Sequence, residues 1–276
     1  TASVLQGTLH GIDAEFSGVS TDTRTLKHGD LFVALVGPNF DGHGFVNEAA
    51  GKGAIGALVS RDLEADIAMV HVADTRLGLG QLAAHWRRQF QMPVIAVTGS
   101  NGKTTVKNMI AAILNVAGLT LATQGNLNND IGVPLTLLRL RQGDRHAVIE
   151  MGMNHPGEID YLTKLACPTI ALINNAAAAH LAGLGSVEAV ARAKGEIYAG
   201  LAADGDVVMR NLATIGRNRR LAPPLPHRFQ RPAADRTLRC CPHTEMLPAC
   251  RAEQLRGNRR AMRGPGSFAW GGACAR

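Results

Sequence analysis

Residues 94–105 read VIAVTGSNGKTT, and this stretch decides the fold. The apolar and β-branched residues 94–97 are typical of a buried strand, and the glycines within residues 98–102 are typical of a tight turn. From Lys103 onward, apolar residues recur at helical spacing, so the pattern predicts a helix with Gly118 as its C′ residue. The positions expected to face the core are Val106, Ile110, Ile113, Leu114 and Ala117.

A strand, a glycine turn and a helix form the arrangement that holds a triphosphate. Backbone N–H groups and the helix N-terminus would face the anion, the Lys103 ammonium would reach the terminal phosphates, and the Thr104 hydroxyl could ligate Mg²⁺. Val97 stands where the general phosphate-loop pattern has a glycine, five residues before Gly102. The alternative is an ordinary strand-to-helix turn, but the flanking strand and helix favour a phosphate loop.

Composition separates a globular body from a different C-terminal part. The 276 residues are 46% apolar, which leaves room for two domains. No run approaches the roughly 20 apolar residues that cross a bilayer. Residues 1–210 hold one cysteine and a net charge of −3, whereas residues 211–276 hold 13 arginines, no lysine and a net charge of +10. A body with one cysteine is typical of the reducing cytoplasm, and the lack of a long apolar run predicts no membrane insertion.

The N-terminus also carries information. It starts at Thr1, with neither an initiating methionine nor the basic and apolar regions of a signal peptide. We therefore expect the sequence to begin inside a longer reading frame.

Residues 1–92 are predicted to form a small α/β domain. Strands are expected over residues 31–35 and 54–59, and helices over residues 45–52 and 75–90. The apolar side of the second helix is expected to comprise Leu77, Leu82, Trp86 and Phe90. Residues 37–44 are rich in glycine and turn residues, so they are expected to form a loop.

Residues 93–212 are predicted to form a doubly wound, mostly parallel nucleotide-binding domain. Further strands are expected over residues 147–152, over residues 169–175 and from residue 206, and helices over residues 135–140 and 187–201, the last capped by Ser186. Strands that alternate with helices favour a parallel sheet. Ligands bind such sheets at the carboxyl ends of the strands, where the phosphate loop, Glu150 and Asn174 all fall.

Beyond residue 212 neither the helical nor the strand period continues, so residues 213–276 are expected to be an irregular tail. Out-of-frame reading of a GC-rich gene favours arginine, proline, alanine, glycine and cysteine. Our hypothesis is a frame shift near Asn211. Sequencing the coding region tests it, because an intact and unshifted gene would remove this explanation.

Several polar residues outside the loop are candidates for chemistry, and each has a simpler interpretation. A carboxylate at the end of a neighbouring strand, such as Glu150, is the usual second anchor for Mg²⁺ beside a triphosphate, although it could be a solvated strand-end group. His180 and Lys194 could be ordinary packed or solvated residues. The amides of Asn126, Asn128 and Asn129 could bind a ligand or simply satisfy loop backbone.

A series of motifs resembles the Mur ligase family. They are TGSNGKT at 98–104, GNLNNDIGVP at 125–134, EMGMNHPGEI at 150–159, Asn174-Asn175 followed by His180-Leu181, and AKGEI at 193–197. The first domain adds STDTR at 20–24, GDLFVAL at 29–35 and DGH at 41–43. The resemblance covers about residues 15–212 through several independent motifs.

The resemblance implies an activity. The strings at 150–159 and 193–197 are most similar to the branch that joins D-alanyl-D-alanine to UDP-N-acetylmuramoyl-tripeptide in peptidoglycan synthesis. That reaction consumes ATP and passes through an acyl phosphate. The implied ligands are therefore ATP, two Mg²⁺ ions and these two substrates, and the implied enzyme is a cytoplasmic monomer that takes part in cell-wall biogenesis.

The resemblance also implies roles for individual residues. The nucleotide would be bound by Gly99, Ser100, Asn101, Gly102, Lys103, Thr104, Thr105 and Asn174. The metals would be held by Thr104, Glu150 and His180, and Lys194 matches a lysine that becomes carbamylated. Lys103, Glu150, His180 and Lys194 would form the catalytic group. Residues 1–92 would form the domain that binds the UDP-muramoyl-peptide, and the substrate would contact Thr23, Arg24, Asn126 and Asn129.

The departure from the family lies at the C-terminus. Mur ligases carry a third, C-terminal domain that closes over ATP. This domain is expected to be absent here, so the chain is expected to ligate poorly or not at all.

Other functions remain as alternatives. Within the ligases, they are a MurE-type enzyme that adds a diamino acid and folylpolyglutamate synthase. The arginine-rich tail suggests a nucleic-acid-binding protein, but it lacks interleaved aromatic residues. Cys240, Cys241, His243 and Cys250 have no standard zinc spacing.

Overall fold

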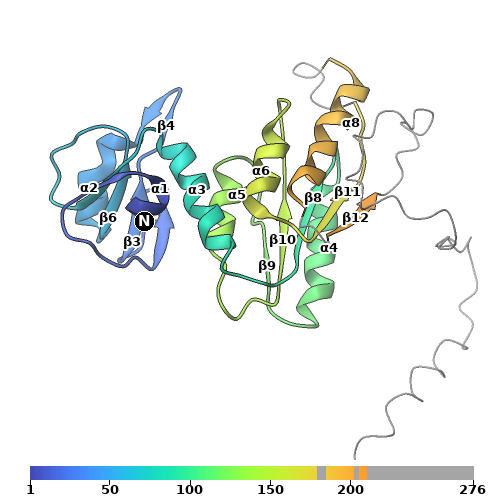
Figure 1. Cartoon of the computed structure of the whole chain (residues 1–276), viewed down its shortest axis with the longest axis horizontal. Coiled ribbons are helices and arrows are strands. Elements are labelled where there is room, and N and C mark those ends of the chain that lie inside the picture. Colours follow the sequence, from blue (N-terminus) through green and yellow to red (C-terminus); the bar gives the residue numbers. More distant parts are fainter. Residues whose placement is uncertain (179–184, 202–204, 210–276) are drawn as a thin grey trace, which may run out of the picture. The chain divides into compact units, whose positions relative to one another are not determined.

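A parallel five-stranded sheet carries the glycine-rich turn in the computed structural model, which describes residues 1–178, 185–201 and 205–209 (Figure 1). Its strands lie in the order β12-β11-β8-β10-β9, and every pairing is parallel. They are β8 (Val94–Thr98), β9 (Thr120–Ala122), β10 (His146–Glu150), β11 (Ile170–Ile173) and β12 (Asp206–Met209). All five residues of β8 are buried, as expected for a central strand covered on both faces.

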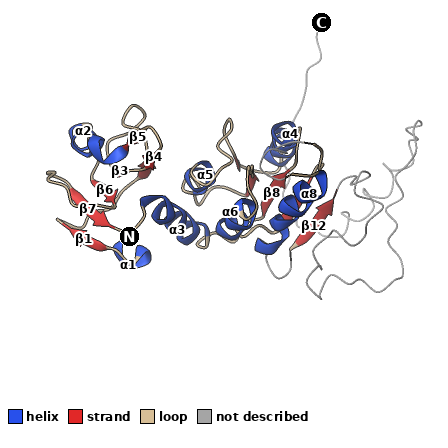
Figure 2. Cartoon of the chain, turned by 90° about the horizontal axis from the view of Figure 1, so that it is seen from above, coloured by secondary structure: helices blue, strands red, loops and turns tan. Residues whose placement is uncertain are grey.

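Helices cover both faces of this sheet, so the predicted doubly wound fold is confirmed. The helices are α4 (Lys103–Asn115), α5 (Gly132–Leu137), α6 (Glu158–Ala166) and α8 (Val187–Gly195), with a 3₁₀ turn η2 (Glu196–Gly200) after the last. α4 packs on the face that carries Ile95 and Val97. α5, α6 and α8 pack on the opposite face, against Val94 and Ala96 (Figure 2).

A second five-stranded sheet lies in the N-terminal part, in the order β1-β7-β6-β3-β2. Its strands are β1 (Thr8–His10), β2 (Gly18–Ser20), β3 (Asp30–Val33), β6 (Gly56–Val59) and β7 (Ala68–His71), and only β1 runs antiparallel to its neighbour. Helices α1 (Ala2–Leu5) and α3 (Thr75–Arg87) pack on one face, and α2 (Val46–Gly51) packs on the other. The prediction of a small α/β arrangement for this region is therefore confirmed.

The C-terminal end of α3 is tied to the parallel sheet by a buried arginine. Arg87 donates hydrogen bonds to the carbonyl oxygens of Ala166 (2.8 Å), Phe90 (2.7 Å) and Cys167 (3.1 Å). Next to it, Trp86 Nε1 donates to the carbonyl oxygen of Leu140 (3.1 Å). One cation thus satisfies backbone carbonyls at the ends of two helices, which otherwise lack intrahelical donors.

Several details of the predicted elements are wrong. Residues 37–44 are more than a loop, because β4 (Val36–Gly37) pairs with β5 (Phe40–Asp41) and the 3₁₀ turn η1 (Gly42–Phe45) follows. The helix expected over residues 135–140 begins earlier, at Gly132, and the helix expected over residues 187–201 changes to 3₁₀ geometry after Gly195. Ser186 does cap that helix, since its hydroxyl accepts from the Ala189 N–H (3.1 Å).

Three apolar positions that were expected in the core lie at the surface, and Ala117, beyond the end of α4, is one of them. Leu77 is 53% exposed on α3, and Ile113 is 69% exposed on α4, because these helices bury narrower stripes than their apolar residues suggest. Gly118 does not adopt the left-handed conformation of a C′ residue, since α4 has already ended at Asn115. The nine-residue helix α6 and the short strands β1, β2, β7 and β9 were not predicted at all.

Some predictions lie beyond what the structure describes. The tail expected over residues 213–276, with its cysteine and histidine cluster, falls outside the described residues. The boundary between residues 92 and 93 stays a prediction. Among the described residues, no helix is both long and apolar enough to span a membrane.

Candidate active site

The phosphate loop lies at the carboxyl end of β8 and is shaped by contacts from the end of β11. Gly102 has a positive φ of 72° immediately before α4, a conformation that favours glycine. The side-chain oxygen of Asn175 accepts hydrogen bonds from the N–H groups of Ser100 (2.9 Å) and Asn101 (3.0 Å). The Asn175 side chain therefore fixes the backbone of Ser100 and Asn101 in the first half of the loop without a bound ligand.

Gly99 makes a close approach that only glycine allows. A Cβ atom at this position would overlap the side-chain oxygen of Asn174. The amide nitrogen of Asn174 donates to the carbonyl oxygen of Asn101 (2.7 Å), whereas its oxygen is buried with no hydrogen-bond partner among the described residues. Asn174 is therefore packed onto the loop and fixes its backbone path.

Replacing Gly99 by alanine should displace Asn174 and distort the loop. Overpacking of this kind costs about 1–3 kcal/mol, so we expect binding of ADP to weaken about tenfold, as measured by isothermal titration calorimetry. Gly44→Ala is the matched control, because a Cβ there meets nothing within 4 Å. Equal ADP affinities of the two variants would contradict the prediction.

Two lysines near the loop influence each other through their charges. Lys103, the first residue of α4, donates from Nζ to the carbonyl oxygen of Gly99 (2.9 Å). Lys194, in α8, is only 1% exposed. Burial, and then the positive charge of Lys103, lower the pKa of Lys194 to about 8. About one Lys194 side chain in ten is therefore a neutral, nucleophilic amine at pH 7.

This shift has a testable effect on stability. The folded protein binds fewer protons at Lys194 than the unfolded chain does between pH 8 and the usual lysine pKa, so stability must rise with pH through this interval. We expect the free energy of unfolding to increase by about 2 kcal/mol from about pH 7 to about pH 9.5. Urea denaturation in CO₂-free buffer measures it. A Lys194→Met variant should lack this increment, and an identical pH dependence in both proteins would refute the assignment.

Glu150 is the last residue of β10, and both of its carboxylate oxygens have partners. It is 1% exposed. Its Oε2 accepts from the Thr104 hydroxyl (3.0 Å) and its Oε1 accepts from the Asn128 amide (2.8 Å). The ammonium of Lys107, which is also buried, lies 3.9 Å from Oε2 and donates to the carbonyl oxygen of Thr123 (2.7 Å). The carboxyl group is thus buried and oriented toward the first turn of α4.

This donor set fits a magnesium ion that is bound together with phosphates. Mg²⁺ prefers oxygen ligands and is usually held by one or two carboxylates plus substrate phosphates, with water filling the other positions. Thr104 and Glu150 supply a hydroxyl and a carboxylate at the end of the phosphate loop. Within the described residues no cluster of three or more His, Cys, Asp or Glu side chains could hold a metal alone. A shared protein–phosphate site is the arrangement these residues allow.

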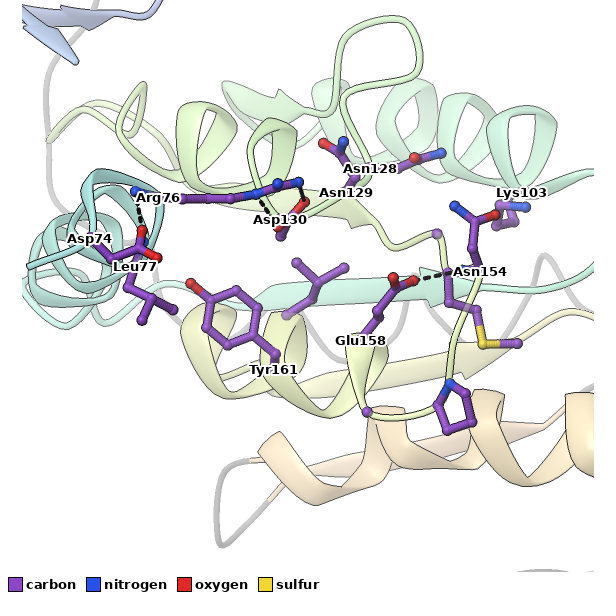
Figure 3. Close-up of a pocket in the computed structure, with 15 residues that line it drawn as sticks. Asp74, Arg76, Leu77, Lys103, Asn128, Asn129, Asp130, Asn154, Glu158 and Tyr161 are labelled. Carbon is purple, nitrogen blue, oxygen red and sulfur yellow. Dashed lines mark hydrogen bonds and ion pairs between the residues drawn. The ribbon is translucent and has the colours of Figure 1, made fainter. Parts of the chain in front are cut away.

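A cavity of about 500 Å³ extends away from the loop (Figure 3). Lys103 and Asn154 line one end. At the other end Arg76 donates to Asp130 (2.8 Å). Tyr161 lies along the wall, and burial together with the negative charge of Asp130 raises its pKa. A polar ligand longer than a nucleotide phosphate could therefore reach the loop from this side.

The structure brings part of the predicted site together. Lys103, Thr104, Glu150 and the loop residues 99–102 lie at the carboxyl edge of the sheet, with Asn174 packed on them. Thr105 follows in the first turn of α4. Asn129 lines the cavity, and its side-chain oxygen accepts from the N–H of Gly132 (2.8 Å), the first residue of α5. Lys194 lies close enough to Lys103 for their charges to interact.

Other predicted residues lie elsewhere. Thr23 donates to Glu48 (2.8 Å) in the N-terminal part and does not line the cavity. Arg24 is exposed, and its hydrogen bonds lower the pKa of Asp22 to about 2. Asn126 is exposed beside the cavity-lining segment. His180 lies outside the described residues.

Sequence reasoning assigned no role to two residues of the site and left the role of a third open. Asn175 was quoted with Asn174 but given no role, although its side chain binds the loop N–H groups. Lys107 was not considered, because a lysine in an amphipathic helix is usually solvated. Its position three and four residues after Thr104 and Lys103, on the same helix face, is the signal that could have found it. Asn128 was left with two interpretations.

Comparison with known sequences identifies two family matches. The family described as "Mur ligase middle domain" matches residues 97–221, and "Mur ligase family, catalytic domain" matches residues 15–87. The UDP-N-acetylmuramoyl-tripeptide–D-alanyl-D-alanine ligase of Escherichia coli (strain K12) is 54% identical over 206 residues, which are 75% of this chain and 46% of that protein. The enzyme of the same name from Haemophilus influenzae is 46% identical over 214 residues, 75% and 47% of the two chains.

Solved structures agree with these matches. MurF from Acinetobacter baumannii superposes with a TM-score of 0.72 at 45% identity, over 75% of this chain and 47% of that one. MurF from Thermotoga maritima, solved in complex with ADP, superposes with a TM-score of 0.65 at 30% identity, over 72% and 47%. The chain spans about half the length of the curated relatives it matches.

Proposed function

Because the chain belongs to the Mur ligase family, we propose that it carries the nucleotide-binding and UDP-muramoyl-peptide-binding parts of a MurF-type ligase. The reaction joins D-alanyl-D-alanine to UDP-N-acetylmuramoyl-tripeptide with hydrolysis of ATP to ADP and phosphate. One observation carries the proposal: the Thr104 hydroxyl donates to the Glu150 carboxylate at 3.0 Å, and the residue before Thr104, Lys103, lines the cavity. Nucleotide, metal and peptide carboxylate can therefore meet at one place.

The reaction proceeds in two steps. A carboxylate oxygen of the tripeptide attacks the γ-phosphorus of ATP, and the bond from that phosphorus to the bridging oxygen breaks, so ADP leaves and an acyl phosphate remains. The amine nitrogen of D-alanyl-D-alanine then attacks the acyl carbon and loses a proton, and the carbon–oxygen bond breaks to release phosphate. Positioning and neutralisation of charge provide most of the catalysis.

The residues of this chain act mainly on charge and orientation. Lys103 neutralises charge on the terminal phosphates, and the N–H groups at the start of α4 bind phosphate oxygens. Asn174 and Asn175 keep the loop in the conformation that receives them. Thr104 and Glu150 would hold Mg²⁺, which supplies neutralisation of phosphate charge when bound. His180 is proposed as a further ligand of a second ion.

Lys194 is proposed to be carbamylated. The Lys194 ammonium would first lose one proton, and the neutral amine would then attack the carbon of CO₂ and release a second proton. A buried cation beside Lys103 would thus become an anion. The lowered pKa of Lys194 and its burial support the step. Protein exchanged into ¹³C-bicarbonate should show a carbamate signal by NMR that a Lys194→Met variant lacks; its absence in the unaltered protein would contradict carbamylation.

The residues proposed to bind the UDP-muramoyl-peptide come from two separate segments of the chain. Asn129 lines the cavity, and we propose that it and Asn126 contact the muramoyl-peptide part. Thr23 and Arg24, which follow β2, are proposed to contact the UDP part. The domain division at residues 92 and 93 is likewise a proposal, with one unit for each ligand.

Binding measurements on the purified chain test the proposed function. ADP should bind more tightly with Mg²⁺ than in EDTA, and UDP-N-acetylmuramoyl-tripeptide should bind independently of D-alanyl-D-alanine. Failure of both nucleotide and UDP-peptide to bind would overturn the proposal. Phosphate release with D-alanyl-D-alanine compared with single amino acids, measured on a full-length relative, separates a MurF-type from a MurE-type specificity.

A further inference from the structure

Asn128 has an unusual set of contacts that the reaction above does not use. It lies between β9 and α5, in the polar segment that precedes the helix. Its side-chain nitrogen donates to Glu150 Oε1 (2.8 Å), and its backbone oxygen accepts from the Gly152 N–H (2.8 Å). Asn128 therefore forms hydrogen bonds with the residues before and after Met151, at the end of β10.

The two oxygens of Glu150 consequently have separate partners. Oε1 is occupied by Asn128, while Oε2 is shared by the Thr104 hydroxyl (3.0 Å) and, at 3.9 Å, by the Lys107 ammonium. A carboxylate can rotate about its last side-chain bond, and a fixed neutral donor on one oxygen prevents this. With Oε1 held, Oε2 stays directed at the phosphate loop.

The neighbouring backbone leaves room for this contact. A Cβ atom on Gly152 would lie 2.8 Å from the side-chain oxygen of Asn128 and 3.0 Å from its Cγ, so a side chain there would push the amide away. The backbone of Glu150 is also fixed, because its N–H donates to the Thr123 hydroxyl (2.9 Å). Glycine at residue 152 and asparagine at residue 128 thus form one packed arrangement.

We propose that Asn128 is a positioning residue that orients the Glu150 carboxylate for metal binding. It does not itself contact the metal or the reacting atoms. The proposal rests on the proposed function, since it presumes that Glu150 binds Mg²⁺ beside a nucleotide. Partners that orient a metal-binding side chain typically contribute 10–100-fold to metal affinity.

The test separates metal affinity from nucleotide affinity. ADP binding to the full chain is measured by calorimetry with excess Mg²⁺ and with EDTA, for the unaltered protein and for Asn128→Leu. We expect the affinity in EDTA to change less than about twofold, because phosphate binding by the loop does not involve Asn128. The Mg²⁺-dependent gain in affinity should fall about 10–100-fold.

Two further variants control for folding. Asn128→Ser keeps a polar side chain that is too short to reach Glu150 and should reproduce the loss, with thermal unfolding confirming a folded protein. Asn108→Leu, the same change at an exposed position of α4, should leave both affinities unaltered. A Mg²⁺-dependent gain that survives in the folded Asn128 variants would overturn the proposal, as would an equal loss in Mg²⁺ and in EDTA.

The same data distinguish this proposal from the function it rests on. If the unaltered chain binds ADP equally well with Mg²⁺ and with EDTA, the metal role of Glu150 fails, and the positioning role fails with it. If the unaltered chain shows the gain and the variants keep it, only the role of Asn128 is wrong.

Discussion

Methionine in place of Lys103 is expected to weaken binding of Mg·ADP by about 100-fold, which corresponds to about 3 kcal/mol. The substitution keeps the length and the apolar stem of the side chain and removes only the charge. In the structure the Lys103 ammonium is fixed at the loop by the Gly99 carbonyl (2.9 Å), so it is already in place to meet a phosphate. Calorimetric titration with ADP in excess Mg²⁺ measures the loss.

Lys164→Met is the matched control for this experiment. Lys164 is an exposed residue of α6 whose ammonium pairs with Asp160 (2.6 Å). Its replacement should change ADP affinity less than about twofold, because a surface ion pair contributes little. Full ADP affinity in the Lys103 variant would show that the loop binds nucleotide without its lysine, and the proposed site would be wrong.

A second readout follows from the same substitution. The charge of Lys103 contributes to the low pKa of Lys194. Without that charge the pKa of Lys194 should rise, and the pH at which stability increases should move upward with it. An unchanged pH dependence of stability would show that burial alone lowers the pKa of Lys194.

Replacing Arg87 by methionine is expected to destabilise the fold by about 4 kcal/mol. The substitution leaves three carbonyl oxygens, those of Phe90, Ala166 and Cys167, without their charged donor. Hydrogen bonds from charged groups contribute about 1.5–3 kcal/mol each and are not additive, so the sum of three is an upper bound. Urea denaturation followed by circular dichroism gives the free energy of unfolding.

The neighbouring residue provides the control. Arg88 is exposed, and Arg88→Met should shift stability by less than about 0.5 kcal/mol. Arg87→Lys should recover only part of the loss, since a single ammonium cannot reproduce the planar fork of the guanidinium. Similar unfolding midpoints for Arg87→Met and Arg88→Met would contradict the role of this buried arginine.

Local sequence patterns were sufficient to predict the parts of the fold that depend on one short segment. The buried strand, the glycine turn and the helix that starts at Lys103 all follow from residues 94–105, and parallel pairing then puts Glu150 at the same edge. The role of Asn175 could not be predicted in this way. Successive residues at a strand end point in different directions, and no local pattern says which loop N–H groups a side chain from a neighbouring strand will bind.

Which residues of a helix are buried depends on the segments that pack against it. Ile113 and Lys107 lie on the same helix, yet the isoleucine is exposed and the lysine is buried. A periodicity argument expects the reverse, because it counts apolar residues and cannot see the Glu150 carboxylate and the Thr123 carbonyl that receive the ammonium. Tertiary partners decided both positions.

The order of strands in the parallel sheet has a consequence for synthesis of the chain. β8 pairs with β10 and β11, whose partner residues follow about 50 and about 75 positions later. The Asn175 side chain that binds the loop N–H groups comes equally late. On a ribosome the nucleotide loop therefore emerges well before the segments that shape it, and these long-range pairings make its assembly a slow, late event in folding. A nascent chain halted before residue 175 would expose an apolar strand and a loop unable to receive phosphate.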